Sequence, residues 1–191
     1  MGATRIHKDP LFYEPRLEPR PAEAVDLVVI HCTELPDLPT ARTFGEKIHH
    51  PESGSGNCGH FYIDRDGRVE QWVDPLRIAH HVRGFNAHSI GIELVNRGRY
   101  PDWLHSGRQV MTEPYPQEQV RSLLDVLLKL QASYPRLRWI AGHEELDTDL
   151  VPASDDPSIT VRRKLDPGPL FPWQEVLRAT ALERWPGAAA S

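Results

Sequence analysis

The stretch VVIHCTE, residues 28–34, carries a run of apolar, β-branched residues directly into His31 and then into polar residues. A short run of this kind, beginning at residue 26, predicts a buried strand. Such a run usually fills a core, so a histidine at its end indicates a side chain delivered to the edge of a sheet. Ligand sites in α/β folds lie at strand ends and in the loops beyond them.

Working outward, strand-like and helix-like segments alternate along the chain. We expect a short helix at 40–50, a hairpin around Asp66-Gly67 at 60–73, strands at 89–96 and 136–143, an amphipathic helix at 116–134 and a C-terminal helix at 172–185. This order predicts an α/β single domain with a mixed central β-sheet flanked by α-helices and an active site at one edge of the sheet. The irregular connection at 97–116 is long enough to predict a functional loop.

The 191 residues are 39% hydrophobic, which suffices for one domain with a sizeable core. The proline-rich segment 1–24 has no sustained apolar period, so we expect an extended N-terminal arm lying on the domain surface. The domain itself is predicted at 25–185, and residues 186–191 are predicted to form a frayed tail.

Composition excludes several classes of partner. The net charge is −5 and the lysines and arginines are scattered, so we expect no nucleic acid partner. No stretch reaches the roughly 20 apolar residues of a membrane helix, and the start lacks the pattern of a secretory signal. We therefore expect no membrane partner, a cytoplasmic location and, by default, a monomer. A phage lysin or an effector secreted without a signal peptide remains an alternative.

Cys32 and Cys58 form no C-x-x-C pair, which excludes a zinc knuckle or a redox dithiol. A reduced compartment fits them better, and a disulfide stays open. Because successive side chains of a strand point to opposite faces, Cys32 cannot face the same ion as His31. We expect Cys32 to serve packing.

His31 and His143 each follow an apolar, strand-like run and each precede polar residues. A catalytic zinc site needs three protein ligands and an open position. Asp166, before a rigid Pro-Gly-Pro, is a candidate third ligand, although spacing alone favours a simple turn there. Glu93 lies inside the apolar run IGIELV, where a carboxylate is costly to bury unless it is paired or coordinated.

Five segments, taken together, resemble the zinc-dependent N-acetylmuramoyl-L-alanine amidases of type 2, the family related to peptidoglycan-recognition proteins. The segments are VVIHCTE, GHFYIDRDGRVEQWV, AHHVRGFNAHSIGIELVN, WIAGHEEL and RRKLDPGPLFPW, in the order of that family, spread over residues 25–175. The resemblance implies a Zn²⁺ ion held by His31, His143 and Asp166. It also implies that Glu93 and Lys164 are catalytic, Glu93 taking a proton from water and Lys164 stabilising the oxyanion.

The reaction implied is hydrolysis of the amide bond between the lactyl group of N-acetylmuramic acid and L-alanine, in peptidoglycan or soluble muropeptides. The resemblance assigns His81 to substrate contact, and we expect Arg83 and Asn86 to contact sugar or peptide carboxylate. Residues 147–161 form an insert relative to compact members of the family. We expect a loop near the metal that shapes or caps the substrate groove.

Two alternatives stay open: a peptidoglycan-binding module without catalysis, and a zinc hydrolase of another amide. Competent residues at all three ligand positions and at both catalytic positions favour the amidase. We expect it to act in bacterial cell-wall recycling.

Overall fold

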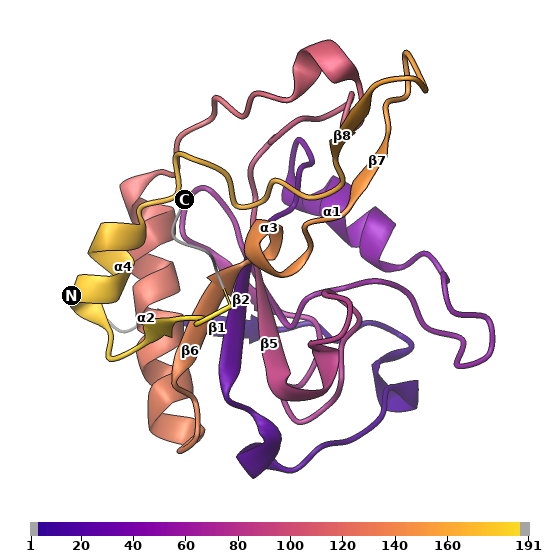
Figure 1. The fold of residues 1–191 in the computed structure, drawn as a ribbon. Helices are drawn as coiled ribbons and strands as arrows, with labels where there is room; N and C mark the ends of the chain where they lie inside the picture. The colour runs from indigo at the N-terminus through magenta and orange to yellow at the C-terminus, as the bar shows by residue number, and fades with distance from the viewer. Residues whose placement is uncertain (1–3, 188–191) are drawn as a thin grey trace.

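The computed structural model describes residues 4–187 and has a seven-stranded mixed sheet at its centre, in the order β1-β4-β3-β5-β2-β6-β9 (Figure 1). The strands are β1 (Ile6–Lys8), β2 (Leu27–Cys32), β3 (Phe61–Ile63), β4 (Val69–Gln71), β5 (Ser89–Leu94), β6 (Trp139–Gly142) and β9 (Glu183–Arg184). The predicted mixed sheet with flanking helices is confirmed. Of the tail predicted at 186–191, residues 188–191 lie outside the described part.

Four α-helices are described: α1 (Leu38–Gly45), α2 (Gln117–Ser133), α3 (His143–Leu146) and α4 (Trp173–Ala179). Single 3-10 turns occur at Glu14–Arg16, Ala22–Ala24, Asn86–His88 and Ser106–Arg108. The predicted amphipathic helix is α2, with Pro116 as its N-cap rather than its first helical residue. No helix within residues 4–187 is long and apolar enough to cross a membrane.

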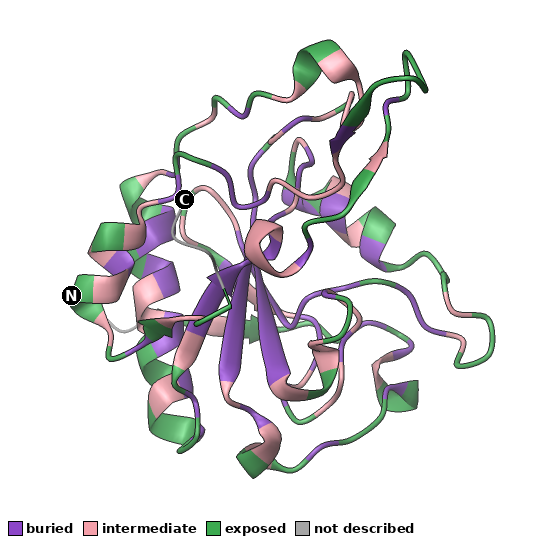
Figure 2. Cartoon of the chain, viewed as in Figure 1, coloured by how far each residue is buried: buried purple, intermediate pink, exposed green. Residues whose placement is uncertain are grey.

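Side-chain alternation along β2 divides the core into two faces. Val28, Ile30 and Cys32 pack into the cluster formed with α2, whereas Leu27 and Val29 face the opposite side. Figure 2 shows β2 buried along its length and β5 buried over most of its length, with exposed residues on the outward surfaces of α2 and α4. Alternation therefore places Cys32 in the core packing beside α2, as predicted. The side chain of His31, one residue earlier, is directed to the face of the sheet away from α2.

The N-terminal segment is extended, but it does not simply lie on the surface as expected. β1 pairs in parallel with β4 at the sheet edge, and Leu11, Tyr13 and Leu17 are buried in a cluster with α1. The Tyr13 hydroxyl donates to the Gly45 carbonyl at 2.5 Å. The prolines of this segment interrupt its apolar period, so the sequence pattern does not predict that it is buried. Its burial depends on contacts with residues distant in sequence.

Two further elements differ from the predictions. The C-terminal helix ends at Ala179 rather than 185, because Thr180 is extended and the chain returns as β9 beside β6. The insert at 147–161, expected as a loop, contains an antiparallel hairpin of β7 (Leu150–Pro152) and β8 (Thr160–Arg162). β9 and the two hairpin strands are each held by pairing with another strand. A short polar segment gives no sign of such pairing in its own sequence.

Candidate active site

Three neighbouring parallel strands bring the first site residues together. In the register of β5 and β2, His31 stands opposite Glu93, and in the register of β2 and β6, Ile30 stands opposite Gly142, the residue before His143. The carboxyl ends of β5, β2 and β6 thus meet in one row. The structure places His31, Glu93 and His143 side by side, as strand ends at a common sheet edge predict.

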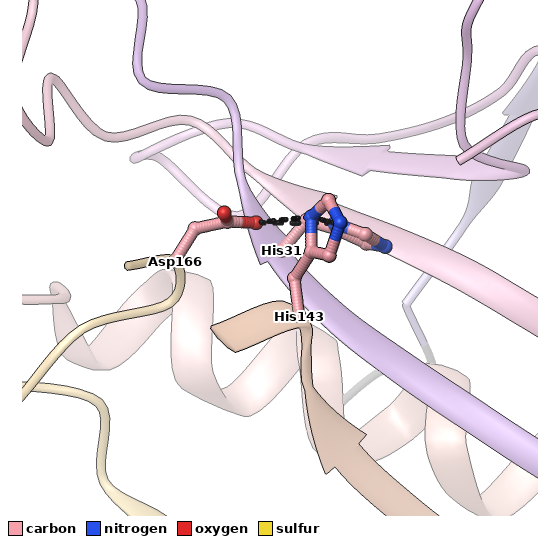
Figure 3. Close-up of side chains that lie close together, drawn as sticks. All are labelled: His31, His143 and Asp166. Carbon is pink, nitrogen blue, oxygen red and sulfur yellow. Dashed lines mark hydrogen bonds and ion pairs between the residues drawn. The ribbon is translucent and has the colours of Figure 1, made fainter. Parts of the chain in front are cut away.

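Asp166 joins this row from the segment that follows β8 (Figure 3). His31 Nδ1 lies 3.0 Å from His143 Nδ1 and 3.1 Å from Asp166 Oδ2, and His143 Nδ1 lies 3.2 Å from the same oxygen. All three residues are buried. The backbone around Asp166 is anchored, because Glu144 N–H donates to its carbonyl and the Tyr115 hydroxyl donates to that of Pro167.

Electrostatics keep His31 and Asp166 in the forms that bind a metal ion. Burial, helped by the neighbouring His143, lowers the pKa of His31 to about 4, so its imidazole is neutral at pH 7. Burial by itself raises the pKa of Asp166, but His143 and His31 outweigh it and hold the pKa well below the usual range. The cluster therefore presents neutral imidazole and carboxylate.

The hydrogen bonds behind His31 decide which of its nitrogens carries the proton. Ser89 Oγ donates to the Phe85 carbonyl, so it accepts from His81 Nε2 at 3.1 Å. His81 Nδ1 must then accept from His31 Nε2, 3.0 Å away. The lone pair of His31 Nδ1 consequently points toward His143 and the Asp166 carboxylate, where it is available to bind a metal ion.

The donor set and its spacing fit zinc. Four ligands placed about 2.0–2.1 Å from a tetrahedral Zn²⁺ lie about 3.3 Å from one another, close to the distances measured here. Two imidazoles and one carboxylate are typical of catalytic zinc, which leaves a fourth position open. Asp166 Oδ1 is buried without a hydrogen-bond partner. His31, His143 and Asp166 could therefore hold the ion.

A cavity of about 730 Å³ opens over this cluster. All the predicted site residues line it: His31, His81, Arg83, Asn86, Glu93, His143, Lys164 and Asp166. Glu93 is half-buried in its wall, and burial followed by the charge of Asp166 raises its pKa to about 8, against the lowering effect of Lys164. Lys164 is also half-buried in the wall.

Three of the predicted substrate contacts have other partners in the structure. Both ring nitrogens of His81 form hydrogen bonds, one with His31 and the other with Ser89, and the residue also lines the cavity. The side-chain carbonyl of Asn86 accepts from the backbone N–H groups of His81 and Val82, which holds that turn. Arg83 is 73% exposed at the rim and pairs with Asp149 of the insert.

The sequence predictions missed one charged pair beside the cavity, Glu34 and Arg99. Both line the cavity, and their side chains are only 7% and 1% exposed. The unusual length of the connection at 97–116 was a signal that this loop is functional. Nothing local singles out Arg99 within it, because most partners of its guanidinium lie in two distant segments, at Glu34 and at residues 162–163.

Fold and site together define a class of protein: a hydrolase that places an imidazole and carboxylate cluster beside a potential general base and a lysine. Residues 21–169 match the family model described as N-acetylmuramoyl-L-alanine amidase, and the chain belongs to this family. The predicted activity is thereby confirmed as hydrolysis of the amide bond between N-acetylmuramic acid and L-alanine, in peptidoglycan or muropeptides.

Relatives agree with this assignment, and solved structures share the fold. The endolysin of Escherichia phage T7 is 28% identical over 134 residues, covering 68% of this chain and 82% of the endolysin. N-acetylmuramoyl-L-alanine amidase AmiD of Escherichia coli strain K12 is 33% identical over 129 residues, or 63% of this chain and 41% of AmiD. The structure of amidase LysC from Clostridium intestinale URNW has a TM-score of 0.65 at 20% identity, over 94% of this chain and 99% of LysC.

An AmiD structure contains a substrate. It is the complex of the Escherichia coli enzyme with anhydro-N-acetylmuramic acid-L-Ala-D-gamma-Glu-L-Lys, and it matches with a TM-score of 0.63 at 25% identity, over 87% of this chain and 60% of that one. A related amidase of the same fold therefore binds a substrate in which anhydro-N-acetylmuramic acid is joined to a short peptide.

Proposed function

We propose that the chain performs its amidase reaction with a zinc ion held by His31, His143 and Asp166. The observation that carries this proposal is the convergence of three donor atoms, His31 Nδ1, His143 Nδ1 and Asp166 Oδ2, within 3.2 Å of one another. When bound, zinc lowers the pKa of a water ligand to about 7 and polarises a carbonyl, which makes an inert amide open to attack at neutral pH.

Glu93 is the proposed general base. It stands opposite His31 in the strand register, on the same face of the sheet, and its raised pKa suits a group that takes a proton from water near neutral pH. Lys164 is the proposed electrophile, because its ammonium group lines the same cavity and can stabilise negative charge on the carbonyl oxygen. Glu93 would thus take the proton that water loses, and Lys164 would stabilise the negative charge that develops on the carbonyl oxygen.

We further propose that soluble muropeptides are the preferred substrates. A cavity of about 730 Å³ is in the range that encloses a small ligand, roughly 300–1,000 Å³. The insert lies next to this cavity, because its Asp149 pairs at 3.4 Å with Arg83, a lining residue. Preference for small fragments would support a role in cell-wall recycling in the bacterial cytoplasm, whereas preference for intact sacculi would support wall lysis.

The test is mass spectrometry of the products released from sacculi and from a soluble anhydromuropeptide, with and without added zinc. We expect zinc-dependent release of free stem peptide, faster from the soluble substrate. Glu93→Gln is the matched control, since it should retain zinc and lose turnover. Zinc-dependent cleavage of a different amide, with no stem peptide released, would contradict the proposed substrate and favour the alternative hydrolase.

A further inference from the structure

The inference concerns the pair Glu34 and Arg99, next to the proposed catalytic site. Every N–H group of the buried Arg99 guanidinium has an acceptor within 3.2 Å. Nε donates to Glu34 Oε1 at 2.7 Å, Nη2 to Glu34 Oε2 at 2.8 Å and to the Arg163 carbonyl at 3.2 Å, and Nη1 to Gln109 Oε1 and to the Arg162 carbonyl, both at 3.0 Å. One side chain therefore joins three segments that are far apart in sequence.

Glu34 is held in place for this contact. Its φ of +48° lies in the left-handed region that residues other than glycine seldom adopt. Its carboxylate also accepts from the Arg99 backbone N–H at 3.1 Å, and its carbonyl accepts from Trp103 Nε1 at 3.0 Å. Gly98 permits the approach, because a Cβ there would lie 2.6 Å from Glu34 Cγ. Strained backbone of this kind persists only where the surroundings determine it.

The third segment is the one that carries Lys164. Arg99 holds the carbonyls of Arg162, the last residue of β8 in the inserted hairpin, and of Arg163, the residue directly before Lys164. A lysine has a flexible stem, so the position of its ammonium group depends on where the backbone places it. A catalytic residue that directly follows a long insert is held in a fixed position only if other contacts anchor the backbone there.

We propose that Arg99, oriented by Glu34, is a positioning residue that fixes the 162–164 backbone and so sets Lys164 over the reacting carbonyl. This inference rests on the role proposed for Lys164. A buried ion pair contributes little net stability compared with well-packed apolar residues, so stability alone is a weak reason for the pair. A displacement of about 1 Å in a catalytic group can lower a rate by about 100-fold, which is a sufficient reason.

The test uses Arg99→Lys, which keeps the positive charge beside Glu34 and removes the fork that reaches both carbonyls. Arg65→Lys is the matched control. Arg65 makes the same kind of bidentate contact with Glu113 and also donates to a carbonyl, that of Pro36, yet it does not touch residues 162–163. Each variant is assayed as zinc-loaded, folded protein, so that a loss of stability does not count as a loss of rate.

For Arg99→Lys we expect kcat to fall at least 10-fold, with KM changed less than 3-fold and zinc content unchanged, whereas Arg65→Lys keeps kcat within 2-fold. Combining Arg99→Lys with Lys164→Met should lower kcat no further than Lys164→Met does, because both act through one ammonium group. Hydrogen exchange of the metal-free protein should show lost protection at residues 160–165 in Arg99→Lys only.

Unchanged kcat in Arg99→Lys, additive losses in the double variant, or unchanged exchange at 160–165 would each overturn the inference. Failure of the proposed function is a separate result, since the wild-type chain would then release no stem peptide. Full turnover by Lys164→Met would overturn the role of that lysine and, with it, the positioning role of Arg99.

Discussion

The two nitrogens of His31 have different tasks. Nδ1 faces His143 and Asp166, while Nε2 donates into a chain that runs through His81 and Ser89 to the Phe85 carbonyl. Gly91 makes room for that chain, because a Cβ at this position would lie 2.7 Å from the His81 ring. A fixed partner behind a metal-binding imidazole sets its tautomer and its direction.

His81→Ala should therefore weaken zinc binding by about 10–100-fold, because His31 loses the acceptor that orients it. Competition with a chromophoric chelator measures the affinity. His80→Ala is the matched control, since the His80 ring lines the same cavity but packs against His50. Equal zinc affinity in the two variants would show that His81 does not position His31.

Ionisation of Glu93 lowers the stability of the folded protein. Its pKa is about 8 against 4.5 for an ordinary glutamate, so above pH 4.5 the unfolded chain ionises more readily than the folded one, and ionisation disfavours folding. Glu93→Gln removes this cost. The metal-free variant should be more stable than wild type by at least about 1 kcal/mol at pH 8, with a gain that grows from about pH 4.5 and levels off above about pH 8.

Thermal unfolding of the metal-free proteins at pH 4 and pH 8 measures this difference. At pH 4 the glutamate is mainly protonated in both the folded and the unfolded state, so the two melting temperatures should nearly agree there. A variant that is less stable than wild type at pH 8 would contradict the account of Glu93.

At the scale of elements, the parallel trio β5-β2-β6 builds the site and the N-terminal segment supports it. The trio sets the register that aligns Glu93, His31 and His143. The N-terminal segment adds β1 to the sheet edge and packs Tyr13 against α1, whose residues Ala41, Phe44 and Gly45 line the cavity. One wall of the cavity thus depends on residues that precede the family match.

Tyr13→Ala should destabilise the protein by about 3–5 kcal/mol, because it removes a fully buried ring together with its hydrogen bond to Gly45. Phe12→Ala is the control from the same segment: its side chain is 59% exposed, so its loss should change stability by less than about 0.5 kcal/mol. Urea unfolding of both variants provides the comparison. Similar losses would mean that the segment packs as a whole rather than through Tyr13.

At the scale of the whole molecule, the proposed ion joins strand β2, the start of α3 and the segment after β8. Removing zinc with a chelator should abolish turnover and lower the melting temperature, and zinc at about 100 times its Kd should raise it again by about 5–10 °C. Calorimetry measures the shift. Asp166→Ala should show no such shift, and a wild-type protein insensitive to zinc would contradict the proposed cofactor.

The sequence by itself determined the elements whose signals are local. The apolar run before His31, the similar run before His143 and the period of α2 each follow from residues within one element, and the five family segments named the site residues. Such a strand can be recognised without its neighbours, because the apolar run and the polar residue that ends it are consecutive in the sequence.

Only the tertiary structure decided the features that depend on distant partners. Burial of Tyr13, pairing of β9 with β6, the β7–β8 hairpin and the contact of His81 with His31 all join segments that sequence separates. The same holds for Arg99, whose five donors find acceptors on three segments. The free energy of such contacts arises from groups that the fold brings together. It therefore cannot be inferred from a run of neighbouring residues.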